Sequence, residues 1–345
     1  LFLARENATQ GLDLYTVSNH SVGGTLGSLS GTDLRLHKGY AKFSPWNVEL
    51  EVGRDSLQWG QGYHGNLIMS DNAAPLDLVK VSNPEATLLP WIFSYLGPLK
   101  YTVFCAQLES DFIPSGPLLS GGHISIKPRP WLELGFSTAF LFNGKGIPGI
   151  SFTEYLQHLF MFGAYGRADT IDQLGAFDLR LTLPFLWNTQ LYLEYGGEDS
   201  GGLKYPEEWF GLGDIAYLTG IYVPKITPDG KTDFRFEFTK TAIRVDPSPG
   251  AWYAHSPYRS GYTHDQMILG HFIGPDALDY FARVSHYLWN NLVIGLDYDH
   301  IERGLTLSNC VETTDGMGVD ARYDLNDRWS ISARYAFDTV SNFNM

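Results

Sequence analysis

The chain has 345 residues, a net charge of −14 at pH 7 and an aromatic content of 14%. This acidic balance argues against a nucleic-acid binder, which needs a basic face to displace counterions from phosphates. No apolar run approaches the roughly 18 residues of a membrane-spanning helix, and the apolar content is too high for a disordered chain. A soluble β-rich protein and a membrane β-barrel remain.

The first motif along the chain is Gly-Gln-Gly-Tyr-His-Gly at residues 60–65, which matches the G-x-G-x-x-G pattern of dinucleotide-binding loops. Such a site requires a buried apolar strand before the glycines and a helix after them. The preceding residues 48–52 form a half-charged strand pattern instead, and Pro75 closely follows the downstream segment. The motif therefore does not predict a nucleotide site, and no cofactor is expected.

Strict alternation of apolar and polar residues is the dominant pattern further along the chain. It occurs at residues 132–142, 177–183, 233–239, 292–299, 317–325 and 329–338. Successive side chains of a strand point to opposite faces, so each segment predicts a strand with one apolar and one more polar face. The separation is complete at residues 233–239, where three phenylalanines alternate with charged residues and a threonine.

A soluble sandwich also alternates, but three features favour a membrane barrel. The segments run about ten residues, near the 9–11 that cross a bilayer and longer than the average soluble strand of about 5–6. Aromatic residues gather at the segment ends, as in interfacial girdles, and the polar face mixes both charges, as in a wet lumen. The sequence predicts an all-β fold, a transmembrane antiparallel β-barrel of about 16–18 strands that forms one domain over residues 1–345.

The alternation also assigns side chains to the two faces of the barrel wall. The charged residues expected to line the lumen are Glu49, Glu51, Asp178, Arg180, Asp233, Arg235, Glu237, Asp320 and Arg322. The apolar residues expected to face lipid are Phe234, Phe236, Phe238, Leu179 and Leu181. Arg54 has the opposite parity to Glu51, so it joins the lumen only if Gly53 marks a β-bulge.

The connections fall into a short and a long class, and in outer-membrane barrels the short turns are periplasmic and the long loops extracellular. From residue 128 onward the two classes alternate as this rule demands. Before it they do so only if a further strand lies near residues 76–81. The long connection at residues 143–173 contains a predicted helix, because Ser151 and Glu154 fit a capping box ahead of apolar residues at helical spacing. Gly163 is its expected end, and the helix should pack on or in the barrel mouth.

The same alternation places the last predicted strand, residues 329–338, on an outward course. Bacterial single-chain barrels have an even number of strands, and their ends are periplasmic. We therefore expect residues 1–345 to lack a final returning strand, with Met345 on the extracellular side.

Two aromatic and polar stretches suit the recognition of sugars, because aromatic faces stack on pyranose rings while carboxylates and imidazoles bond to hydroxyls. The candidate carbohydrate-binding residues are Tyr205, Glu207, Trp209, Trp252, Tyr253, His255, Tyr258 and Tyr262. The same residues could equally form an interfacial girdle or plug the barrel mouth. His255, His264 and His271 match no metal motif by spacing, so no metal site is expected. Cys105 and Cys310 belong to no motif, and either a disulfide or two thiols is compatible with them.

Residues 52–75 resemble the signature of the capsule assembly protein Wzi family. The residues that carry this resemblance are Gly53, Arg54, Trp59, Gly60, Gly62, Asn72 and Pro75, and blocks at 106–111, 172–180 and 252–276 are similar to the family in the same order. The resemblance implies an outer-membrane β-barrel, eighteen-stranded in the family, that acts as a lectin and holds capsular polysaccharide on the cell surface. The family also includes an N-terminal periplasmic helical bundle, and residues 1–47 show no such pattern.

Together these features predict an outer-membrane protein, embedded in lipid, that binds surface polysaccharide through its extracellular loops and has no catalytic activity. Two alternatives remain open. A barrel of this size can enclose an aqueous pore, so the protein could be a porin-like diffusion channel. It could also be a barrel that scaffolds a partner protein, which co-purification would reveal.

Overall fold

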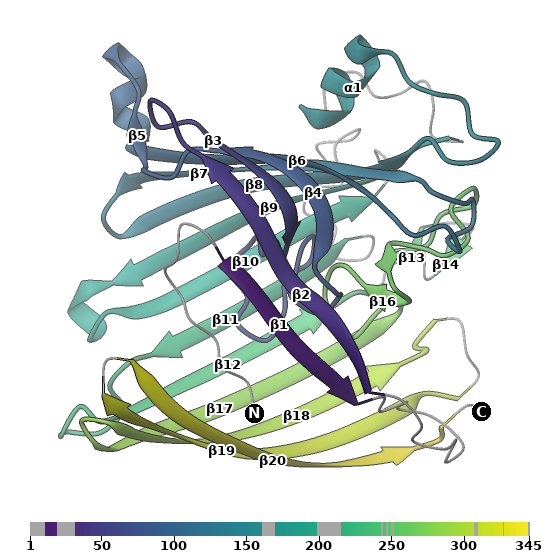
Figure 1. Ribbon diagram of the computed structural model, residues 1–345. Coiled ribbons are helices and arrows are strands. Elements are labelled where there is room, and N and C mark those ends of the chain that lie inside the picture. The colour runs from purple at the N-terminus through teal and green to yellow at the C-terminus, as the bar shows by residue number, and fades with distance from the viewer. Residues whose placement is uncertain are drawn as a thin grey trace.

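The computed structural model describes residues 11–18, 32–160, 170–198, 215–242, 244–245, 248–249, 252–306, 310–326 and 328–343. Its main feature is one antiparallel sheet of sixteen strands, in which β5 pairs only with β6 and the others follow chain order (Figure 1). These strands are β1 (Gly11–Ser18), β2 (Thr32–Phe43), β3 (Glu49–Asp55), β4 (Leu76–Ser82), β5 (Thr87–Leu88), β6 (Pro98–Gln107), β7 (Leu118–Arg129), β8 (Leu132–Phe142), β9 (Asp172–Leu183), β10 (Thr189–Glu198), β11 (Ala216–Val223), β12 (Thr232–Lys240), β17 (Ala277–Trp289), β18 (Leu292–Arg303), β19 (Glu312–Asn326) and β20 (Trp329–Ser341).

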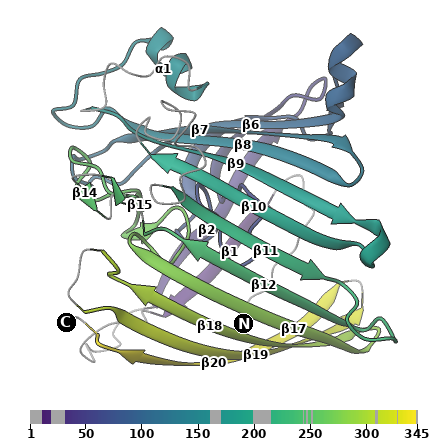
Figure 2. The same cartoon turned by 180° about the vertical axis from the view of Figure 1, so that it is seen from behind.

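The sheet curls around an interior, and its strands are tilted in both views of the molecule (Figures 1 and 2). The strand order begins at β1 and ends at β20, and no pairing between these two is present in the described residues. The all-β prediction and the strand expected near residues 76–81 are confirmed. Within the part of the chain that the structure describes, the sheet is thus open between β1 and β20, whereas a closed barrel leaves no strand edge exposed to lipid.

The shorter elements lie in the connections between these strands. They are the two-stranded ladders β13 (Arg244–Val245) with β14 (Ser248–Pro249) and β15 (Thr263–His264) with β16 (Met267–Ile268), and the helices η1 (Trp91–Leu96), α1 (Phe152–Leu159) and η2 (Pro184–Leu186). Across the described ranges, no helix has the length and apolar content that a membrane crossing requires.

The outer and inner faces of the wall alternate as the sequence pattern predicts. In β4, even-numbered residues are buried and odd-numbered residues are exposed. In β12, Asp233 and Glu237 are buried, whereas Phe236 is 36% exposed on the other face. Leu179 and Leu181 lie on the same face of β9 as the exposed Phe177, whose ring packs 4.8 Å from that of Phe136 on β8.

Tryptophans gather at the rim formed by the short connections. Two of these connections contain a turn with positive φ at two successive residues, Trp46 and Asn47 in one and Trp187 and Asn188 in the other, as type I′ turns require. Six of the nine tryptophans lie at this rim and are exposed: Trp46, Trp91, Trp131, Trp187, Trp289 and Trp329. Amphipathic indole rings concentrate at membrane–water interfaces, and short turns of outer-membrane barrels face the periplasm, so we expect this rim to be the periplasmic boundary of the hydrocarbon layer.

The outward face gives a direct test of membrane insertion. Phe236→Lys is expected to reduce the free energy of unfolding by about 2–4 kcal/mol, because it places a charge on the lipid side near mid-strand. Trp289→Lys, at the periplasmic end of β17, should cost about 0–1 kcal/mol. Denaturant unfolding of both variants in lipid vesicles measures the difference. Equal costs at the two depths would contradict a bilayer around this wall.

Helix α1 forms at the predicted place and packs on the outside of the wall. Ser151 and Glu154 make the capping box, with the Ser151 hydroxyl accepting from Glu154 N at 3.2 Å. Tyr155 and His158 cover Phe140 of β8, which is fully buried. The helix therefore rests against the outer face of β7–β9 at the rim of long connections (Figure 1). It ends at Leu159, and Gly163, its expected end, lies outside the described residues.

Candidate functional site

The interior of the barrel is filled from the side of the long connections. Residues 56–75, which join β3 to β4, and residues 252–274, which precede β17, pack against one another as a plug. Leu67, Ile68 and Met69 are at most 1% exposed. Backbone bonds join the two segments, including Ser70 N to Leu269 O at 2.8 Å. The wall contributes the other side of this core through residues such as Leu119, Leu174 and Leu218.

Two carboxylates of the wall hold residues 60–67 of the plug by their backbone. Glu194 on β10 accepts from the N–H groups of Gln61 at 2.6 Å, Gly62 at 2.8 Å and Leu67 at 2.8 Å. Glu237 on β12 accepts from the N–H groups of Tyr63 at 2.7 Å and His64 at 2.9 Å. The G-x-G-x-x-G segment thus uses its backbone donors as a phosphate-binding loop would, but its anions are the protein's own side chains.

This arrangement explains the glycines of the motif. Gly60 has φ +118°, and a Cβ there would overlap the Glu194 carboxylate. A Cβ on Gly62 would overlap the carbonyl oxygen of Gly65. Both positions therefore require a residue without a side chain, because the loop and the carboxylate approach each other at backbone distance.

The other residues of the family motif fix the ends of the plug loop. Trp59 is 5% exposed and stacks on His123 at 5.9 Å between ring centroids. The Asn72 amide donates to Ile268 O at 2.9 Å, and Pro75 is buried just before β4.

Gly53 marks no bulge, because the pairing of β3 with both its neighbours runs through it without a shift. Arg54 therefore keeps the parity opposite to Glu51 and makes a two-point contact with Asp77 on β4, with its Nε 2.7 Å from Oδ1.

Charged residues on the inner face form paired networks. Glu51 lies 3.1 Å from Lys42 and 2.6 Å from Lys80. Asp297 on β18 accepts from Arg283 at 3.0 Å and Arg334 at 2.6 Å. The other residues expected in the lumen also lie on the inner face. Arg180 shares that face of β9 with Asp178, which contacts Gln61 of the plug, and Asp233 shares that face of β12 with Arg235, which lies over the ring of Tyr63. The remaining three lie beside charged partners: Glu49 beside Lys42, Asp320 beside Arg283 and Arg322 beside Asp324.

Most of the predicted sugar-binding residues that the structure describes are buried. Four of them belong to the plug core, at most 2% exposed: Trp252, Tyr253, Tyr258 and Tyr262. His255 is partly exposed beside Tyr258, and Tyr205, Glu207 and Trp209 lie outside the described residues.

The buried tyrosine hydroxyls connect loop segments. Tyr253 donates to Leu67 O at 2.6 Å, and Tyr258 donates to Asn143 O at 3.0 Å. Burial raises the pKa of both phenols, so both hydroxyls remain neutral donors. In this arrangement the tyrosine rings support the loops and do not offer a free stacking face.

A pocket opens where the β6–β7 connection meets residues 260–266. Its volume is about 330 Å³, and its lining residues are Glu109, Asp111, Phe112, Ser260, Thr263 and Gln266. Glu109 fixes one wall, since its carboxylate lies 2.8 Å from His264 Nδ1 and accepts from Asp265 N at 3.0 Å. Ile113 N donates to the Ser260 hydroxyl at 2.9 Å and joins the two loops.

Asp111 and Gln266 are exposed at this pocket and present polar groups to a ligand. Sequence reasoning missed the pocket residues as binding candidates. The available signal was the block at residues 106–111, which resembles the family but carries no aromatic side chain.

A tilted antiparallel wall with an apolar exterior, a tryptophan rim and a charged, loop-filled interior defines the class of plugged outer-membrane β-barrels. The sequence matches the capsule assembly protein Wzi family over residues 5–345, and the chain belongs to that family. It is accordingly an outer-membrane protein.

One curated relative is an uncharacterized 55.8 kDa protein in the cps region of Klebsiella pneumoniae. The two are 27% identical over 209 residues, which span 59% of this chain and 40% of the relative. The match thus covers about two fifths of that relative's length.

Solved structures share the fold. Wzi of Escherichia coli, described as an outer-membrane, carbohydrate-binding β-barrel involved in group 1 capsule assembly, superposes with a TM-score of 0.75 at 22% identity, covering 92% of this chain and 68% of that one. OpdL of Pseudomonas aeruginosa gives a TM-score of 0.52 at 13% identity, covering 90% and 78%. OpdQ of the same organism gives 0.53 at 11%, covering 98% and 82%.

Proposed function

We propose that this protein binds surface or capsular polysaccharide at the extracellular mouth of a plugged barrel, and that it acts by binding and not by catalysis. The observation that carries the proposal is the pocket between the β6–β7 connection and residues 260–266. It lies among the long connections, at the end of the wall opposite the tryptophan rim, which is the extracellular end.

The chemistry of the pocket suits a glycan. Two carboxylates, two hydroxyls and an amide surround a volume of about 330 Å³, with the ring of Phe112 in one wall. Carboxylate and amide oxygens accept from sugar hydroxyls, and side-chain hydroxyls both donate and accept. Membership in a capsule assembly family supports a polysaccharide ligand. Tyr205, Glu207, Trp209 and His255 remain in the proposal as further contacts on neighbouring loops.

The diffusion channel is the second candidate, because a barrel wall of this size can enclose an aqueous pore. The plug argues against it. Residues 56–75 pass through the interior and are held by buried carboxylates on β10 and β12. We therefore propose that the barrel lies in outer-membrane lipid and retains a ligand at its mouth.

The double variant Asp111→Asn, Gln266→Ala tests the pocket. Its affinity for the purified polysaccharide should fall about tenfold or more, equivalent to at least about 1.4 kcal/mol of binding free energy. Binding is measured by calorimetric titration of the detergent-solubilised protein. Asp229→Asn, in the exposed β11–β12 turn at the opposite rim, is the matched control and should bind as the wild type does.

Trp209→Ala in the same titration tests the neighbouring loop. A tenfold loss in this variant alone would move the site from the pocket to residues 197–211. Unchanged affinity in both the pocket variant and Trp209→Ala would contradict the proposed site.

A further inference from the structure

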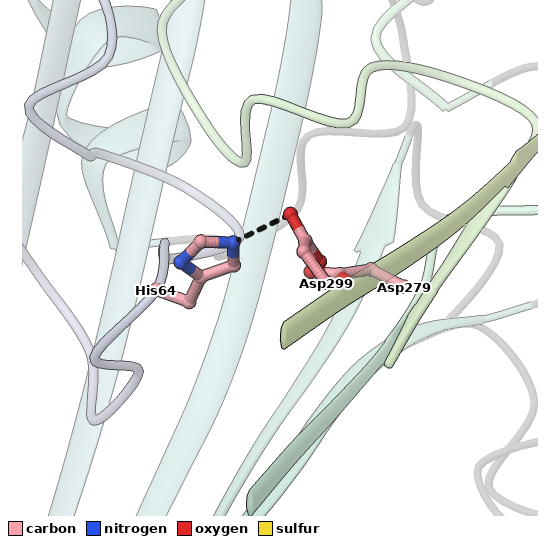
Figure 3. Close-up of side chains that lie close together, drawn as sticks. All are labelled: His64, Asp279 and Asp299. Atoms are coloured by element: carbon pink, nitrogen blue, oxygen red, sulfur yellow. Dashed lines mark hydrogen bonds and ion pairs between the residues drawn. The ribbon is translucent and has the colours of Figure 1, made fainter. Parts of the chain in front are cut away.

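Three potential metal ligands from distant parts of the sequence converge inside the barrel. His64 belongs to the plug, whereas Asp279 and Asp299 lie on the neighbouring wall strands β17 and β18. One ligand atom from each lies within 4.8 Å of those of the other two. Figure 3 shows the two carboxylates side by side, with the imidazole directed at Asp299. His64 Nε2 lies 3.1 Å from Asp299 Oδ2.

One oxygen of each carboxylate lacks the donor that a buried acidic pair requires. Asp279 is 1% exposed, and its Oδ1 has no hydrogen-bond partner in the described part of the chain. Oδ1 of Asp299 is likewise buried without one there. Two close carboxylates repel each other, and an ionised carboxylate removed from water needs a compensating charge.

The surrounding charges supply only part of this compensation, which comes from Arg303. Glu237, on the adjacent strand β12, adds a third carboxylate to the same region. The Arg303 guanidinium bonds to Ile273 O at 3.1 Å and contacts Glu312 at 3.4 Å. Arg235 is stacked over the rings of Tyr63 and Tyr222. Three carboxylates thus lie close together in the interior, an arrangement that a bound cation would stabilise.

The imidazole is held in position for a ligand role. Its ring stacks on Phe281 at 3.9 Å between centroids and meets Phe272 edge-on at 4.7 Å. A fully buried second imidazole, that of His271, has its Nε2 3.9 Å from Asp279 Oδ2. Such packing keeps the His64 side chain in one rotamer, which lowers the entropic cost of binding an ion.

We propose that His64, Asp279 and Asp299, with His271 beside them, bind a divalent transition-metal ion of the zinc or manganese class. Imidazole with carboxylate is a donor set suited to such ions. Adjacent ligands at about 2.0–2.1 Å from a tetrahedral ion lie about 3.3 Å apart, near the 3.1 Å between His64 Nε2 and Asp299 Oδ2. The ion would join the plug to β17 and β18, a role separate from sugar binding.

The test uses the full chain in detergent, stripped with chelator, dialysed against Zn²⁺ or Mn²⁺ and assayed by elemental analysis. We expect about one ion per chain, and at least a tenfold lower occupancy in His64→Ala and Asp299→Asn. His264→Ala removes the other histidine–carboxylate cluster, formed with Glu109 and Asp265, and should leave the occupancy unchanged. Heat-modifiable migration in gels identifies variants that remain folded.

Asp279→Asn keeps the proposal testable if the other variants do not fold, because it removes a ligand and also relieves the repulsion. It should fold, lose the ion and lose the rise in melting temperature that the ion gives the wild type. Absence of stoichiometric metal in the wild type would overturn the proposal and indicate a proton shared by the two carboxylates. Loss of metal in His264→Ala but not in His64→Ala would overturn it as well. Absence of metal in the wild type would leave the polysaccharide titration unaffected, so the two proposals fail independently.

Discussion

Glu194→Ala is expected to give the barrel an ion conductance that the wild type lacks. The substitution removes the acceptor of three buried backbone donors, those of Gln61, Gly62 and Leu67. Each unsatisfied buried donor costs about 1–3 kcal/mol, so the loop loses several kcal/mol of attachment to the wall. The interior of a wall this size is wide enough for an aqueous pore once the loop moves away.

Single-channel recording in planar bilayers measures this effect. The wild type should be silent and Glu194→Ala should show open events, whereas Glu133→Ala on the nearby strand β8 should stay silent. A steady open pore in the wild type would favour the diffusion channel. A silent Glu194→Ala with unchanged stability would show that the carboxylate does not hold the plug.

Gly60→Ala is expected to destabilise the protein by about 3 kcal/mol or more. The residue has φ +118°, which side chains rarely adopt, and the added methyl group would overlap the Glu194 carboxylate. Backbone strain of this kind costs about 1–3 kcal/mol, and overpacking adds a similar amount. Denaturant unfolding followed by tryptophan fluorescence gives the free energy.

Gly149→Ala provides the comparison, because a Cβ there would meet only Asn143 Oδ1 at 3.7 Å and φ is not in the left-handed region. Its unfolding free energy should stay within about 0.5 kcal/mol of the wild type. An equally small change for Gly60→Ala would mean that the loop is not packed against Glu194 as described.

The wall was predictable from sequence because its information is local. Alternation with period two predicted β8, β9, β12, β18, β19 and β20 with their faces, as at Phe234 to Phe238 with Asp233 and Glu237 on the other face. The capping box of α1 is equally local, since Ser151 and Glu154 are three residues apart. Trp46, Trp187 and Trp289 follow the same logic, because each stands in or next to a short connection.

The plug and the pocket were not predictable because their partners are distant in sequence. Glu194 is 133 residues from Gln61, and Glu109 is 155 residues from His264. The aromatic stretch at 252–262 illustrates the same limit, since composition cannot distinguish rings that stack on a ligand from rings that support a loop. Only the fold shows that Trp252 and Tyr262 are buried.

A calorimetric titration of the wild-type protein with polysaccharide extracted from the cells that produce it tests the central claim most directly. A plugged barrel that retains glycan at its extracellular mouth predicts saturable binding to the detergent-solubilised protein. A titration without binding, or one indistinguishable from that of an unrelated porin of similar size, would contradict it.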